Sequence, residues 1–470
     1  MTVQRKATIK PLDRSKPPKS GPPGKVAFPK YFEKVYRNGF KMFVVENHGL
    51  PLVTVGFVVK AGSTLDGGLP GLASVTSELL TKGTKNRNAV RIADEIDFVG
   101  GSLSSSSSWD SSQVFISTLK IHLDTCLEVL QDVVLNPSFP DEEIDRLRAQ
   151  RIASIIKMKS EPSYLADTKF SSVVFKGHPY AMPAGGTEDS VTAMKREDFV
   201  GYHHDYYTPD SSFIVFAGDI TAREADRFVS KYFGKWKGKN PKVSVPPPDG
   251  DSTDNPIYIV DKPGAVQSTL RIGHIGIARN NSDFIKVAFM NTLLGGYFGS
   301  RINMNLREAH GYTYGGRTIF DARILPGSFE VSADVRNEVT AETIDEIMKE
   351  LKRIRTALPT KEEMKQVRGY LSGLFPIQLE TPQQVAGRVV AIEMYHLPKN
   401  YYRNYRKNVA AVTAADVRSV ARKYIHPDKL SIVLSGNSKE ISRSLLRLRQ
   451  VKVLSPSGKE FQVFEQGEEH

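Results

Sequence analysis

Two hydrogen-bond donors, Arg307 and Tyr314, stand seven residues apart in the segment LREAHGYTYG. A guanidinium and a phenol that are held in place can stabilise negative charge developing on a reacting oxygen, at about 3–4 kcal/mol of barrier for one donor. Gly311 lies between them and is expected to end the helix that carries Arg307. The spacing alone favours a more ordinary interpretation, which is a surface Arg–Glu pair and a core tyrosine.

A second candidate is the segment SLSSSSSWDSSQVFIST, which follows Gly100-Gly101 and is predicted to begin with a strand of small polar side chains. Ser104, Ser105 and Ser106 could belong to a strand that binds an extended peptide by β-addition, through backbone hydrogen bonds. The alternative is an edge strand that its serines keep soluble. The sequence leaves these two interpretations equally open.

The ten histidines do not predict a metal site, since no two of them have the i, i+4 spacing of a helical zinc site. The adjacent His203 and His204 would point to different faces of a helix. Cys126 is the one cysteine, so no internal disulfide can form. This cysteine content fits a reducing compartment but is also found in periplasmic proteins.

An internal repeat organises the chain. VTAMKREDFVGYHHDYYTPDSSFIVFAGD starts at Val191, and VAAVTAADVRSVARKYIHPDKLSIVLSGN starts 218 residues later at Val409. Each copy predicts a short helix, a Pro-Asp turn and an apolar strand that ends in glycine. Thr413, with Asp416 three residues later, predicts a helix N-terminus. A period of this length indicates domain duplication rather than a solenoid.

The division between the two copies falls in residues 237–256, which contain five prolines and have the composition of a stiff linker. It separates residues 31–236 from residues 257–450, with tails predicted at 1–30 and 451–470. Strands precede helices in each half. We therefore expect an α+β fold of two tandem homologous sandwich domains, each an antiparallel-rich sheet covered by helices.

Composition and charge exclude several classes of protein. The 470 residues are 40% hydrophobic and 25% charged, and no run approaches eighteen apolar residues, so we expect no transmembrane segment. Residues 1–30 hold eight basic side chains and one acid, out of a net charge of +12. We expect a disordered basic arm; the alternative is an arm that docks on an acidic partner. The body lacks a basic stripe with interleaved aromatics, which argues against nucleic-acid binding.

The first thirty residues also lack the apolar segment of a signal peptide, which favours a cytoplasmic location for the chain as given. A periplasmic location stays open if a signal was trimmed.

Several segments together resemble the pitrilysin/insulinase-type zinc peptidases, which include processing peptidases. GLASVTSELLTKGT at 71–84, with VKAGS at 59–63 before it, is similar to the helix that carries the inverted zinc motif. IADEIDFVGGSLSSSSSWD at 92–110 and LLGGYFGSRINMNLREAHGYTYG at 293–315 are similar to further segments of the family. The similarity covers about 31–440 and implies that the two domains form a clamshell.

The departure from the family falls on the metal ligands. Active members carry H-x-x-E-H, but the alignment places Ser74 and Glu78 at the two histidine positions and Ser77 at the glutamate base. The third ligand would fall near Ala153–Ser154, in the acid-free stretch QRIASIIKMK. A catalytic zinc needs three protein ligands, so we expect no metal in this chain.

The resemblance implies that Arg307 and Tyr314 reach across to a zinc site, grip the peptide and stabilise the oxyanion. Active relatives usually carry Asn where Ser104 stands. The chain keeps the Arg307 and Tyr314 donors but lacks the zinc ligands. We therefore expect it to be the non-zinc subunit of a two-chain metallopeptidase and to be inactive alone. Its expected partners are a zinc-bearing homologous subunit, which holds the zinc, and a peptide or unfolded substrate.

Two other functions stay open at this stage. The chain could be a non-catalytic scaffold like the core subunits of the respiratory cytochrome bc complex, which share the family's fold. It could also capture peptides or unfolded segments without cutting them.

Overall fold

The first half of the molecule is built on a six-stranded sheet. The computed structural model describes residues 26–250 and 256–464. The strands follow the order β1-β2-β6-β3-β5-β4, and they are antiparallel except for the pair β2–β6. Their bounds are β1 (Phe32–Val35), β2 (Lys41–Glu46), β3 (Leu52–Val59), β4 (Ser102–Ser107), β5 (Ser112–Leu119) and β6 (Ser212–Gly218).

One face of this sheet packs against helices of the same half, and a hydrophobic core fills the space between them. The central strands carry buried side chains at almost every position, as expected for strands covered on both faces. The main helices of this half are α1 (Leu72–Leu79), α2 (Ala89–Phe98), α3 (Leu123–Leu135), α4 (Asp141–Met158), α6 (Glu188–Ala193), α7 (Arg196–Tyr206) and α8 (Ala222–Phe233).

The second half repeats the plan on a seven-stranded sheet, in the order β13-β12-β7-β11-β8-β10-β9, with its own core. Its strands are β7 (Ile257–Asp261), β8 (Gln267–Ile275), β9 (Thr313–Asp321), β10 (Ser328–Arg336), β11 (Ser431–Gly436), β12 (Val451–Leu454) and β13 (Glu460–Phe464). Its longer helices are α9 (Phe284–Asn291), α11 (Thr340–Thr356), α12 (Lys361–Ile377), α14 (Tyr401–Ala411), α15 (Ala414–Tyr424) and α16 (Ser438–Leu446).

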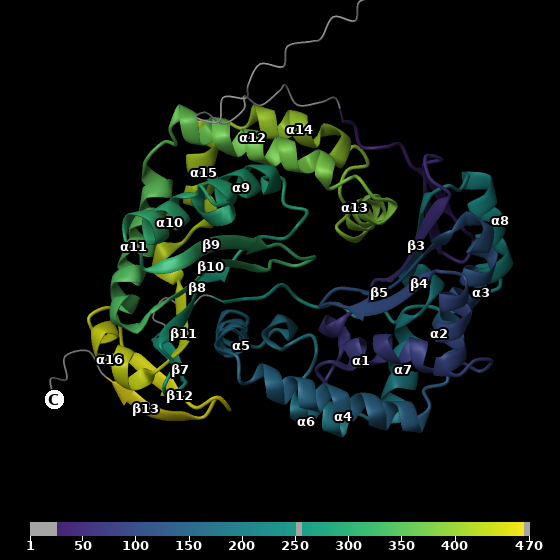
Figure 1. The fold of residues 1–470 in the computed structure, drawn as a ribbon, viewed down its shortest axis with the longest axis horizontal. Helices are drawn as coiled ribbons and strands as arrows, with labels where there is room; N and C mark the ends of the chain where they lie inside the picture. The colour runs from purple at the N-terminus through teal and green to yellow at the C-terminus, as the bar shows by residue number, and fades with distance from the viewer. Residues whose placement is uncertain (1–25, 251–255, 465–470) are drawn as a thin grey trace, which may run out of the picture.

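Two helices cross between the halves. Helix α5 (Pro162–Val174) belongs to the first half but packs on β8 and β11 of the second sheet. Helix α13 (Pro382–Met394) belongs to the second half but packs on β3 and β6 of the first sheet. Both helices lie between the two sheets (Figure 1). Each sheet is therefore covered on its second face by a helix from the other half.

The predicted fold class is confirmed, because both halves are sheets covered by helices. The repeat unit predicted at its second copy is also present, with α15 beginning in a capping box made by Thr413 and Asp416. No helix among residues 26–250 and 256–464 is long and apolar enough to cross a membrane.

The prediction of a C-terminal tail at 451–470 is wrong for residues 451–464, which form the hairpin β12–β13 at the edge of the second sheet. Residues 465–470, the linker residues 251–255 and the basic residues 1–25 lie outside the described part of the chain. Phe28, in the predicted N-terminal tail, is buried with its ring centroid 5.4 Å from that of Tyr402.

Candidate functional site

The start of α1 is fixed by one buried carboxylate. Asp66 accepts hydrogen bonds from the backbone N–H groups of Gly71, at 2.6 Å, and Ala73, at 2.8 Å. Burial raises the pKa of Asp66 to about 7, and the backbone donors oppose this shift. Gly71 precedes the helix with a φ of 94°, in the left-handed region that glycine tolerates. This turn fixes how Ser74, Ser77 and Glu78 project from the helix.

Ser77 and Ser105 join α1 to the serine strand. Their hydroxyl oxygens are 2.7 Å apart, and the Ser105 hydroxyl also lies 2.7 Å from the carbonyl oxygen of Ser77. Ser77 is fully buried. In the family alignment the glutamate base occupies this position, but here a neutral hydroxyl supports the adjacent strand. It therefore has a structural partner rather than an exposed position from which to activate water.

The three serines proposed for peptide binding do not share one face of β4. Side chains alternate along a strand, so Ser105 turns toward α1 while Ser104 and Ser106 lie exposed on the opposite face. β4 is the edge of its sheet and pairs only with β5 in the described structure. Its outer backbone edge is thus available for β-addition, with Ser104 and Ser106 beside it.

Arg151 completes the region where the family alignment expects a metal. It extends from α4, forms an ion pair with Glu78 and donates a hydrogen bond to the hydroxyl of Ser74 at 3.3 Å. Its side chain is 16% exposed, and that of Glu78 is 39% exposed. A guanidinium therefore contacts two of the three side chains that replace the zinc motif.

These residues do not fit a zinc ion. Neutral serine is a poor ligand, Glu78 is neutralised by Arg151, and a fixed cation at the site repels a second one. Among residues 26–250 and 256–464, no three His, Cys, Asp or Glu side chains are grouped so that they could hold a metal.

Sequence reasoning missed Arg151 because its role depends on the packing of α4 against α1. The available signal was its position, two residues before Ala153, where the family's third ligand was expected.

Arg307 and Tyr314 lie in the second half, on either side of a sharp chain reversal. Arg307 belongs to a π-helical turn, η7 (Met304–Ala309), which ends before Gly311, a residue with a φ of 64°. The predicted end of the helix at Gly311 is therefore confirmed. The backbone N–H of Gly311 donates to the carbonyl oxygen of Arg307 at 3.1 Å, and Tyr314 follows on edge strand β9.

Both side chains are accessible to a partner. Tyr314 is 89% exposed, which contradicts the alternative of a core tyrosine. The Arg307 guanidinium lies 4.8 Å from the ring centroid of Phe298, and its Nε is 3.3 Å from the Glu308 carboxylate, so the surface Arg–Glu pair exists. No hydrogen bond or ion pair joins these two donors to Ser74, Ser77 or Glu78 within the described residues.

Comparisons with known proteins match both halves. Residues 41–188 match the family described as insulinase (Peptidase family M16), and residues 193–371 match the family described as the Peptidase M16 inactive domain.

Among curated relatives, an uncharacterized zinc protease of Mycobacterium leprae is 26% identical, over 86% of this chain and 92% of its own. A non-peptidase homolog, YmxG, of Helicobacter pylori is 22% identical, over 84% and 91%. A crystal structure of a peptidase M16 inactive domain from Pseudomonas fluorescens superposes with a TM-score of 0.83 at 23% identity, over 87% of this chain and 98% of its own.

Proposed function

Since this chain belongs to the M16 (insulinase) peptidase family, we propose that it is a non-zinc subunit that supplies Arg307 and Tyr314 to the active site of a zinc-bearing homologous partner. The partner holds the zinc, and the two chains together hydrolyse a peptide. The observation that carries the proposal is a contrast between the halves. Arg151 and Glu78 neutralise each other where a metal is expected, while Tyr314 stays 89% exposed.

In this proposal the chain's own groups act on the substrate. The exposed phenol of Tyr314 and the guanidinium of Arg307 are donors that can be aimed at the oxygen on which negative charge develops. The outer edge of β4 offers backbone groups for an extended peptide, with Ser104 and Ser106 beside them. The described residues offer neither the ligand set of a catalytic zinc nor a glutamate base at Ser77, so in this proposal the chain alone does not cleave peptides.

The test is to purify the chain alone and together with a zinc-bearing homologue from the same genome, and to assay a quenched fluorescent peptide. We expect activity only from the pair, and zinc only in the partner. Arg307→Ala and Tyr314→Phe should each lower kcat/KM of the pair by at least about 100-fold. Lys361→Ala, which removes an exposed charge from α12, is the control and should leave the rate unchanged. Stoichiometric zinc in this chain alone would refute the proposal.

A non-catalytic role is the second candidate, favoured by the similarity to a protein named as a non-peptidase homolog. Two outcomes of the same experiment distinguish the candidates. Unchanged activity of the pair after Arg307→Ala and Tyr314→Phe supports a scaffold. Peptide affinity of the chain without any partner, and no hydrolysis with one, supports peptide capture.

A further inference from the structure

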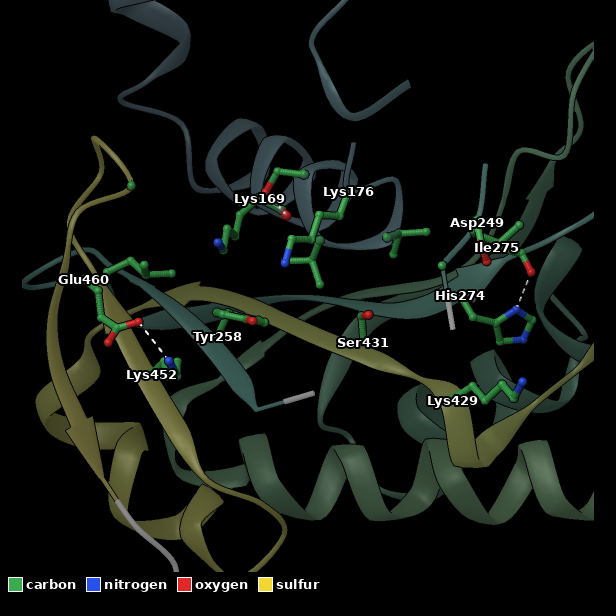
Figure 2. Close-up of a pocket in the computed structure, with 16 residues that line it drawn as sticks. Lys169, Lys176, Asp249, Tyr258, His274, Ile275, Lys429, Ser431, Lys452 and Glu460 are labelled. Carbon is green, nitrogen blue, oxygen red and sulfur yellow. Dashed lines mark hydrogen bonds and ion pairs between the residues drawn. The ribbon is translucent and has the colours of Figure 1, made fainter. Parts of the chain in front are cut away.

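A groove of about 630 Å³ lies between α5 and the second sheet, apart from the residues discussed so far. Figure 2 shows Lys169 and Lys176 reaching down from the α5 side, above a floor that includes Tyr258 and Ser431. The floor crosses β13, β12, β7, β11 and β8, which are neighbours in that order. The groove exists because α5 crosses from the first half onto the second sheet.

Cations dominate this groove. Lys169, Lys176, Lys429 and Lys452 line it, against the two acids Asp249 and Glu460. Lys452 and Glu460 form an ion pair, with 3.2 Å between the ammonium nitrogen and a carboxylate oxygen. The remaining lining therefore carries more positive than negative charge.

Lys169 and Lys176 have no ion pair among the described residues, although the carboxylate of Glu460 acts on Lys169 from a distance. Lys169 lies over the ring of Tyr258, 4.5 Å from its centroid, and burial lowers the pKa of this lysine. Within the described residues, no carboxylate lies at ion-pairing distance from Lys169 or Lys176. The ammonium of Lys169 is half-buried without an ion-pair partner, which is costly, and an anion that entered the groove would offset that cost. Lys176 is exposed and adds positive charge to the same groove.

The dimensions of the groove match an extended chain. Neighbouring strands lie about 4.8 Å apart, so five strands span roughly 19 Å. An extended peptide covers about 3.3 Å per residue, so about six residues fit across the floor. Hydroxyl groups of Ser172 and Ser431 and apolar side chains such as Val173 and Leu454 line the groove together with the lysines. This mixture suits a polypeptide, whose backbone and side chains need both kinds of contact.

A compact phosphate group fits less well. Among the described residues that line the groove there is no arginine, whose planar fork is the preferred bidentate partner of phosphate. The part of α5 that faces the groove, from Lys169 to Val174, is its C-terminal end, where the helix dipole is negative. Separated lysines instead suit carboxylates that are spread along an extended segment.

We propose that the groove beneath α5 binds an acidic polypeptide segment of about six residues in extended form, with Lys169 and Lys176 as its main electrostatic contacts. The site goes beyond the proposed function, because it uses neither Arg307 nor Tyr314 and requires no zinc-bearing partner. A failure of either proposal leaves the other intact.

The experiment measures fluorescence anisotropy of a labelled hexapeptide of alternating glutamate and serine, added to the full-length chain at low salt. We expect saturable binding that weakens with added salt, because screening acts on charge pairs. The double variant Lys169→Gln/Lys176→Gln should weaken binding by at least about tenfold, whereas Lys235→Gln/Lys239→Gln should not. Lys235 and Lys239 are exposed outside the groove, so the control removes the same charge.

Three outcomes would overturn the site. They are no saturable binding by the wild-type chain, equal weakening by both double variants, or equal affinity for a hexapeptide of alternating lysine and serine. Displacement of the acidic peptide by inorganic phosphate at a concentration below the peptide's own Kd would assign the groove to phosphate instead. Thermal melts of both double variants should match the wild type, which separates loss of binding from loss of fold.

Discussion

The carboxylate of Glu393 lies 2.9 Å from the ammonium nitrogen of Lys41, although 352 residues separate the two in the sequence. Lys60 forms a second ion pair with the same carboxylate. Glu393 belongs to α13, Lys41 begins strand β2 of the first sheet, and Lys60 directly follows strand β3. On the other side of the molecule, Asp167 of α5 pairs with Arg271 of β8. Helices α5 and α13 are thus each joined by an ion pair to the sheet of the other half.

Removing Glu393 should destabilise the fold, because two lysines would lose their partner where α13 meets the first sheet. The Glu393 side chain is 10% exposed, and the lysines pull the pKa of its carboxyl down against the effect of burial. We expect Glu393→Ala to cost about 3 kcal/mol, measured by urea unfolding. Glu338→Ala, which breaks an exposed pair with Arg336, should cost less than about 0.5 kcal/mol. Similar costs for both variants would show that the ion pairs of α13 do not stabilise its docking.

Stability should fall as pH rises from about 4.5 to 7 because of Glu330. Burial, with Asp167 and Asp321 nearby, raises the pKa of Glu330 to about 7, although Arg271 opposes this shift. The folded state therefore holds a proton that the unfolded state has released, so the contribution of Glu330 to stability is fully present below pH 4.5 and is lost up to pH 7.

Glu330→Gln removes the part of this dependence that is due to Glu330 and leaves the part due to Asp66, whose pKa is also raised to about 7. We expect the variant to gain about 2 kcal/mol relative to wild type between pH 5 and pH 8. Melting curves of both proteins at the two pH values measure this difference. If the difference in stability between the variant and the wild type were the same at both pH values, Glu330 would have its ordinary pKa.

Restoring the zinc motif alone should not restore zinc binding. In Ser74→His/Ser77→Glu/Glu78→His the Arg151 guanidinium still lies beside the new ligands, and the acid-free stretch around Ala153 offers no third ligand. We expect no stoichiometric zinc after dialysis, measured by elemental analysis. Adding Arg151→Ala and Ala153→Glu removes the cation and supplies a third ligand, so this variant should retain about one zinc per chain. Stoichiometric zinc in the triple variant would show that Arg151 does not obstruct the site.

Cutting the chain in the linker should not yield two independent domains. The face of the first sheet with Phe43 and Phe213 packs on α13, and the second sheet packs on α5. Each fragment expressed alone should expose an apolar face, bind a hydrophobic dye and melt without cooperativity. Co-expressed fragments should associate and recover a cooperative melt. A cooperative, dye-free first fragment would contradict this account.

The sequence predicted the features that follow from local patterns. Residue types and their spacing predict the 218-residue repeat, the capping residues Thr413 and Asp416 and the end of the helix at Gly311. The predicted pair Arg307 and Tyr314 is accessible, but contact with a partner's metal is a property of two chains and stays a prediction.

Other features depend on packing that one sequence does not encode locally. The apolar residues of a helix such as α5 have the same spacing whichever sheet the helix covers, so the sequence does not indicate that α5 and α13 each pack on the sheet of the other half. Arg151 sits among other charged residues of α4, and only the approach of α1 gives it partners. The hairpin β12–β13 was missed although both strands alternate apolar and polar residues, because runs of four and five residues are too short to mark a strand on their own.

The reciprocal packing of α5 and α13 is the arrangement that an isologous two-fold dimer would have, in which each copy lends one helix to the other. A single ancestral half could satisfy both of its sheet faces only by pairing with a second copy. Gene duplication would then have fused a dimer that already existed, and the proline-rich linker would mark the place of fusion. The interface formed by α5 and α13 would then have existed before the fusion. Each half could therefore change its sequence without having to build that interface again.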